Sequence, residues 1–205
     1  MKRNRAGLGG LRLTALLAVA LPASAQAHTT LKGMNDFWNG AFHPLLTPAH
    51  ALLLLGLGLW LGQQVPLRLG WPVRGFLVFA AVGLALTTAG FLPGVPSAVL
   101  AALALGVGAL VALEKPLPVL ARSVVFAAAA LAVGLDSGVE TGGAVKVAMT
   151  LLGTWTALTV GLLNLAFYAS MATETRRKWL HIGLRVVGSW IVAITVLILA
   201  FSLRK

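Results

Sequence analysis

Two histidines seven residues apart open the first long apolar stretch of this sequence. The run His43-Pro44-Leu45-Leu46-Thr47-Pro48-Ala49-His50 begins with one imidazole and ends with the other. Because an α-helix has about 3.6 residues per turn, this spacing predicts that both rings lie on one helical face. Ionisable side chains at the mouth of a membrane span are energetically costly, and they are candidates for function for that reason.

Two carboxylates, Asp136 and Glu140, follow a later apolar stretch and lie four residues apart. They would share one helical face if the helix continued through both. Imidazole and carboxylate ligands together suit nickel, zinc, copper, iron and cobalt ions. We therefore expect His43, His50, Asp136 and Glu140 to bind a divalent transition-metal ion. An alternative stays open, in which the two acids are solvated loop residues and His43 binds a backbone carbonyl.

The composition predicts an all-α protein, a polytopic bundle of transmembrane helices. Of its 205 residues, 59% are hydrophobic and only 10% are charged, whereas a soluble domain has about 25% charged residues. The apolar stretches are long enough to cross a bilayer, which takes about 20 residues per helix. They do not alternate as the strands of a membrane barrel do. The sequence has no cysteine, which excludes thiolate ligands and disulfides.

The N-terminus predicts a signal peptide over residues 1–27, with a basic start, a short apolar centre and the cleavage pattern Ala25-Gln26-Ala27. The alternative is an uncleaved signal anchor. Residues 28–43 would then form a polar exported segment. Its His28, which cleavage would make the first residue, and its Asp36 are further candidate metal ligands.

Residues 44–205 predict a transmembrane domain of six helices. The expected spans are residues 44–62, 75–92, 97–113, 119–135, 144–171 and 179–203. Two G-x-x-x-G pairs, Gly58 with Gly62 and Gly134 with Gly138, predict close contacts between helices.

Basic residues predict the orientation of these spans. If the leader is exported, the expected inner loops hold seven Lys and Arg residues and the outer segments hold four. This bias favours both termini on the exported side of a bacterial inner membrane, and it places both ionisable pairs at the outer face. The net charge of +11 is explained by the leader and by the ends of the spans, so it does not indicate a nucleic-acid partner.

A second polar pair, His181 and Arg185, lies near the inner end of the last span. Snorkelling of the arginine to the interface is the favoured interpretation. An inner gate or exit relay that includes Glu174 is the alternative. Ser137 beside Gly138 is weak support for a hydrolase, because no G-x-S-x-G elbow is present. We do not expect an enzyme.

The chain resembles the HupE/UreJ family of hydrogenase and urease accessory proteins, which are regarded as nickel permeases. His43-Pro44 and His50 match the ends of the family motif H-P-x-x-G-x-D-H. Gly134, Gly138 and Glu140 match its second motif, H-G-x-A-H-G-x-E, and the length and the six-span layout are similar too. The resemblance implies that His43, His50 and Glu140 belong to the metal site.

The sequence also departs from both motifs. Thr47 and Ala49 stand where the first motif has glycine and aspartate, and Val133 and Ser137 stand where the second has histidines. Asp136 stands where the family has a small residue. We hypothesise that Asp136 replaces the carboxylate that is missing at position 49. With two imidazoles missing, oxygen ligands make up more of the expected site. Such a site is a harder set of ligands, in the sense of hard and soft acids and bases, and is less selective for nickel.

The sequence thus favours an inner-membrane permease for a divalent transition-metal cation, most of all nickel, with cobalt, copper and zinc as other substrates. We expect no permanently bound cofactor. There is no Walker-type loop for ATP, so the membrane potential would drive transport. The alternative is a membrane metal-binding or scaffold subunit that transports nothing. The expected partners are the metal ion and the lipid bilayer, and a homo-oligomer or a cytoplasmic metallochaperone stays open.

The replacement hypothesis predicts the behaviour of a double variant. Moving the carboxylate back to its family position, with Ala49→Asp and Asp136→Ala combined, should retain metal uptake because one carboxylate still serves the site. Uptake of labelled nickel checks this. An inactive double variant that still folds would contradict the hypothesis.

Overall fold

The computed structural model describes residues 34–92, 94–139, 142–175 and 177–202. Those residues form α-helices joined by short loops, and no strand occurs among them. The predicted signal peptide, His28 and Glu140 lie outside the described residues. The helices are α2 (Asp36–Leu46), α3 (Pro48–Gly62), α4 (Trp71–Thr88), α5 (Ser97–Ala112), α6 (Val119–Asp136), α7 (Ala144–Glu174) and α8 (Lys178–Ser202).

Four of these helices, α4, α6, α7 and α8, are long and apolar enough to cross a membrane. The pair α2 and α3 would add a fifth crossing, although the two helices are bent by 77° from each other. Helix α5 is apolar but has only 16 residues. The chain is therefore an all-α protein with several candidate membrane crossings, as the composition predicted.

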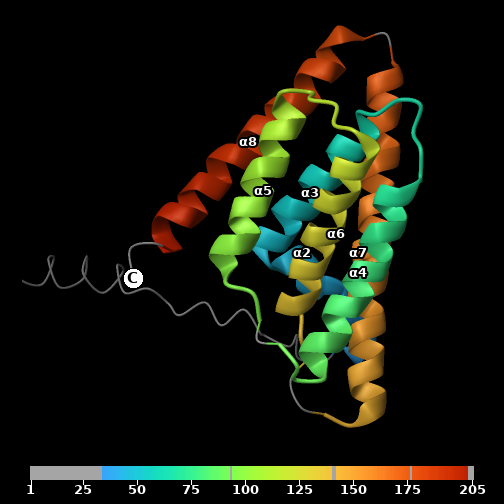
Figure 1. Ribbon diagram of the computed structural model, residues 1–205, viewed down its shortest axis with the longest axis vertical. Helices are drawn as coiled ribbons and strands as arrows, with labels where there is room; N and C mark the ends of the chain where they lie inside the picture. The colour runs from blue at the N-terminus through green and yellow to red at the C-terminus, as the bar shows by residue number, and fades with distance from the viewer. Residues whose placement is uncertain (1–33, 93, 140–141, 176, 203–205) are drawn as a thin grey trace, which may run out of the picture. The chain divides into compact units, whose positions relative to one another are not determined.

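Helix α3 lies at the centre of the described bundle (Figure 1). Eleven of its 15 residues are buried, as expected of a helix that is apolar on every side. It packs mainly against α7 and α5. Around it the strongest pairings are α4 with α6, α5 with α8, and α2 with α7.

The prediction of one continuous helix from residue 44 to residue 62 is wrong. Helix α2 ends at Leu46 and α3 begins at Pro48, with Thr47 between them in an extended conformation (φ −88°, ψ 110°). A proline disfavours the helical conformation in the residue before it, so Pro48 favours a break at Thr47, although His43 stays helical before Pro44. The proposed boundary between an exported segment and the first span, at residues 43 and 44, falls inside α2.

Small residues let the main helix pairs approach closely, as the G-x-x-x-G patterns predicted. Gly58 and Gly62 of α3 lie against the backbone and side chains of α7. Gly134 of α6 lies against Gly83 and the backbone of α4, where a Cβ atom on Gly134 would come within 2.7 Å of the Ala80 carbonyl oxygen. The α4–α6 pair thus depends on the absence of side chains at this crossing.

A substitution at this crossing should therefore destabilise the fold. Gly134→Ala should cost about 1–3 kcal/mol, because the new methyl group meets backbone atoms that cannot move aside alone. Gly106→Ala is the matched control, since its Cβ would meet nothing within 4 Å and alanine favours a helix over glycine by about 1 kcal/mol. Thermal unfolding in detergent checks both. A drop in melting temperature for Gly106→Ala as large as for Gly134→Ala would contradict this view of the packing.

Candidate metal site

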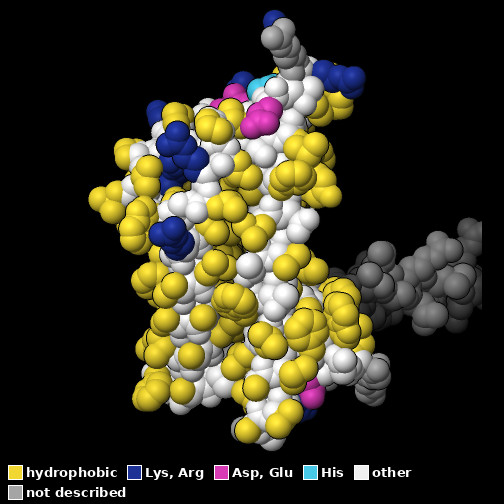
Figure 2. All heavy atoms as spheres, turned by 90° about the vertical axis from the view of Figure 1, so that its right-hand side faces the viewer, with side chains coloured by type: hydrophobic (Ala, Val, Ile, Leu, Met, Phe, Trp, Pro, Cys, Tyr) yellow, Lys and Arg dark blue, Asp and Glu magenta, His cyan; other side chains and the backbone are white. Residues whose placement is uncertain are grey.

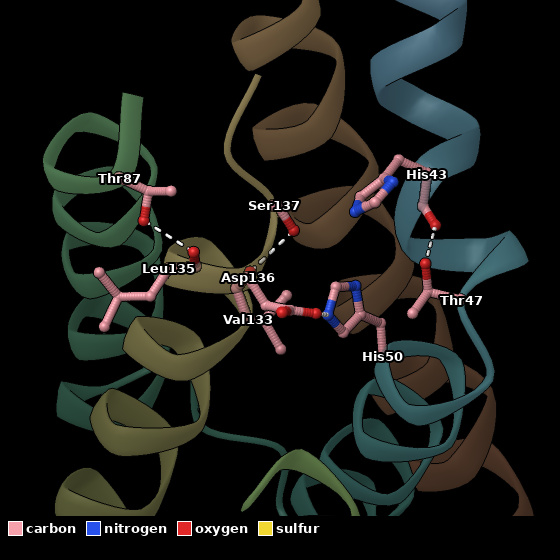
Figure 3. A network of polar contacts seen from close by, with 8 residues as sticks. All are labelled: His43, Thr47, His50, Thr87, Val133, Leu135, Asp136 and Ser137. Carbon is pink, nitrogen blue, oxygen red and sulfur yellow. Dashed lines mark hydrogen bonds and ion pairs between the residues drawn. The ribbon is translucent and has the colours of Figure 1, made fainter. Parts of the chain in front are cut away.

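A hydrogen bond between His50 and Asp136 joins two segments that are 86 residues apart in the sequence (Figure 3). His50 lies in the first turn of α3, and Asp136 is the last residue of α6. The His50 Nε2 atom is 2.9 Å from Asp136 Oδ2. The His50 side chain is fully buried, whereas the Asp136 side chain is 29% exposed. The carboxylate therefore reaches both a buried ring and solvent at the end of the bundle.

This hydrogen bond determines which nitrogen of His50 is available to a ligand. An ionised carboxylate only accepts hydrogen bonds, so Nε2 carries the hydrogen and donates it to Asp136. In a neutral imidazole the other nitrogen, Nδ1, then has a lone pair. Nδ1 is buried, and no described residue forms a hydrogen bond with it. A carboxylate that holds the far nitrogen of a histidine is the usual arrangement behind metal-binding imidazoles.

The His43 ring lies next to the His50 ring. Their centroids are 5.5 Å apart, and the ring planes meet at 70°. Figure 3 shows the two rings close together, with Ser137 beside His43. They come from two helices, α2 and α3, so the predicted cause of their proximity, one shared helical face, is wrong. The bend at Thr47 brings them together instead.

The position of His43 follows from the prolines around it. Pro44 has no N–H to donate to the Gly40 carbonyl within α2. That carbonyl accepts a hydrogen bond of 3.0 Å from the hydroxyl of Thr154, a buried residue of α7. At the end of α2 the His43 carbonyl accepts bonds from both the N–H and the hydroxyl of Thr47. The sequence pattern does not indicate either threonine bond, although proline at position 44 predicts an unpaired carbonyl nearby.

Side-chain hydroxyl groups also form hydrogen bonds with backbone carbonyls at the end of α6. The Thr87 hydroxyl of α4 donates to the Leu135 carbonyl at 2.7 Å, and the Ser137 hydroxyl donates to the Val133 carbonyl at 2.7 Å (Figure 3). These bonds satisfy carbonyls that a helix end leaves without partners. Because α6 ends at Asp136, the helix does not continue to Glu140, and the predicted shared face of the two acids is not formed.

The structure does not gather the complete set of predicted ligands. Within the described ranges, no three His, Asp or Glu side chains are grouped so that they could hold one metal ion. Asp136 binds Nε2 of His50. Asp36 lies seven residues before His43 in α2, about 10 Å along the helix axis. The described part of the site therefore consists of two imidazoles and one carboxylate that orients one of them.

The second polar pair lies where α5 ends against the start of α8. Arg185 Nε donates to the Ala112 carbonyl at 3.0 Å, which is consistent with a side chain that follows the helix surface to a polar partner. His181 Nδ1 lies 4.0 Å from Glu114 Oε1. The acid that lies beside His181 is thus Glu114, whereas the relay alternative names Glu174.

The bond between His50 and Asp136 should make a measurable contribution to stability. Removing the carboxylate with Asp136→Ala leaves a buried ring N–H without a partner, which costs about 1–3 kcal/mol. A double-mutant cycle with His50→Ala, measured by thermal unfolding in detergent, should show a coupling of similar size. Additive effects of the two substitutions would contradict a direct bond.

Comparison with known proteins agrees with the resemblance seen in the sequence. The family described as HupE / UreJ protein matches residues 15–198, which is most of the chain. No curated protein and no solved structure matches it. The family is associated with accessory nickel and cobalt permeases and is not an enzyme family. Because this family model matches most of the chain, the chain belongs to the HupE/UreJ family.

Proposed function

We propose that this protein is an inner-membrane permease for a divalent transition-metal cation, most of all nickel, with cobalt, copper and zinc as other substrates. The observation that carries the proposal is the bond from Asp136 to His50 Nε2. With Nε2 held by this bond, the buried Nδ1 is the His50 atom that would bind the metal, and the His43 ring, whose centroid is 5.5 Å from that of His50, would supply the second imidazole. Two imidazoles suit first-row transition metals, whereas magnesium and calcium sites are built from oxygen ligands.

In this proposal Asp136 is not a metal ligand itself, in contrast to our expectation from the sequence. It orients His50, fixes the position of its hydrogen and makes the ring a better electron donor. Its negative charge also offsets part of the cost of bringing a dication into a site of low polarity. Water and the acid Glu140, with Asp36 and His28 as candidates further out, would complete the coordination.

The proposed direction of transport is from the exported side to the cytoplasm. Six crossings result if α5 and the bent α2–α3 pair both cross the membrane, after a cleaved signal peptide. Most Lys and Arg side chains on the face shown in Figure 2 lie in its upper half, and the positive-inside rule assigns such an end to the cytoplasm. The membrane potential would draw a cation inward with about 2.3 kcal/mol per charge per 100 mV.

A non-transporting metal-binding or scaffold subunit is the second candidate. The observation in its favour is that the described residues gather no group of three metal-binding side chains. Such a site could hold an ion without passing it on. The two candidates differ in one measurable property, which is the accumulation of metal behind a sealed membrane.

We expect proteoliposomes with a negative interior potential to accumulate labelled nickel, and His50→Ala to abolish both binding and uptake. Asp136→Asn should weaken nickel binding about 10–100-fold, since that is the usual effect of removing a partner behind a metal-binding histidine. His181→Ala is the matched control for binding, because it removes an imidazole at the α5–α8 end and should leave nickel affinity unchanged.

Binding that depends on His50 without accumulation would support the scaffold candidate. Equal nickel affinity in the wild type and in His50→Ala would contradict the site itself. A loss of binding in His181→Ala as large as in His50→Ala would show that nickel binds imidazoles without selecting this site.

A further inference from the structure

An apolar groove of about 570 Å³ runs along the joint between α4 and α6. These helices pack against each other over their length, and both are candidate membrane crossings. The groove is separate from the residues around His50. Its lining consists of Trp71, Arg74, Gly75, Val78, Phe79, Ser123, Val124, Ala127, Ala128 and Leu131.

Small residues form the floor of this groove. A Cβ atom on Gly75 of α4 would make only ordinary van der Waals contacts with α6, whose nearest atoms would be 3.8 Å away. Ala127 and Ala128 face it from α6. Val78 and Val124 rise on either side, and both are more than half exposed. On a candidate membrane-crossing surface, such a groove faces the acyl chains of the bilayer.

One charged side chain, that of Arg74, belongs to this lining, in which the only other polar side chain that is neither aromatic nor charged, Ser123, donates to the Val119 carbonyl within α6. Its guanidinium carbon lies 5.6 Å from the centre of the Trp71 ring, which leaves the edge of the guanidinium able to donate hydrogen bonds. No carboxylate lines the groove, and no described Asp or Glu forms an ion pair with Arg74. The polar end of the groove therefore has an uncompensated positive charge.

We propose that this groove binds an anionic phospholipid of the bilayer, with an acyl chain against Val78, Val124 and Ala128 and the phosphate at Arg74. An acyl chain fits the apolar walls, and the phosphate matches the planar donors of arginine. A zwitterionic lipid would bring a cation beside Arg74, where no lining carboxylate could pair with it. A free phosphate would use the arginine and leave the apolar groove without an occupant.

Bound lipid should also stabilise the fold. It contacts α4 and α6 together, and the same pair carries the close crossing at Gly83 and Gly134. A ligand that binds only the folded state raises the apparent stability by an amount that grows with the logarithm of its concentration relative to its dissociation constant. The melting temperature of the purified protein therefore reports on the groove independently of metal binding.

The test uses the full chain in detergent, with phosphatidylglycerol or phosphatidylcholine added and bound lipid counted by native mass spectrometry. We expect phosphatidylglycerol to bind more tightly and to raise the melting temperature more. Arg74→Gln should weaken its binding about fivefold, which corresponds to about 1 kcal/mol for one basic residue at an anionic headgroup. Arg177→Gln removes the same charge outside the groove and should leave binding unchanged.

Two further variants keep the proposal falsifiable if Arg74→Gln does not fold. Arg74→Lys keeps the charge and should retain the preference for the anionic lipid, whereas Ala128→Trp fills the groove and should reduce phosphatidylglycerol binding without any change in charge. Equal binding of the two lipids to the wild type would overturn the proposal. Equal losses of phosphatidylglycerol binding in Arg74→Gln and Arg177→Gln would overturn it too. So would phosphatidylglycerol binding that is unchanged in Ala128→Trp and is displaced by inorganic phosphate.

Discussion

The hydrogen bond between His50 and Asp136 links parts of the bundle that otherwise touch little. Helix α6 packs mainly on α4, and α3 packs mainly on α7 and α5. Direct contacts between α3 and α6 are few, so the 2.9 Å bond is the principal polar connection between them. Water is scarce around a fully buried ring, and a charged acceptor there forms a stronger bond than it would at an exposed surface.

The broken helix before His50 is the second constraint on this site. A straight helix would have placed the two imidazoles two turns apart along one axis. The break at Thr47 turns α2 away by 77° and folds the His43 ring back towards His50. Pro44 leaves the Gly40 carbonyl without its helical donor, and the Thr154 hydroxyl of α7 donates to that carbonyl instead. Irregular backbone in a membrane protein is tolerated where protein groups satisfy it in this way.

The two ends of the bundle differ in chemistry. Asp136 and both described imidazoles of the candidate site lie where α6 ends and α3 begins. The opposite end includes Arg74, Glu114 and His181, together with the start of the α4–α6 groove. If the bundle transports a cation, both ends favour inward movement. Asp136 attracts the cation at one end, and the basic residues at the opposite end favour placing that end in the cytoplasm.

Composition and spacing alone predicted the helical class and the small-residue contacts of Gly58, Gly62 and Gly134. Those features are local, since the length of an apolar run and the size of a residue do not depend on distant partners. The sequence could not show that Asp136 holds the far nitrogen of His50, or that α6 ends before Glu140. A hydrogen bond across 86 residues forms only when separate helices pack, because the donor and the acceptor come from different helices. The break at Thr47 has a local cause in Pro48.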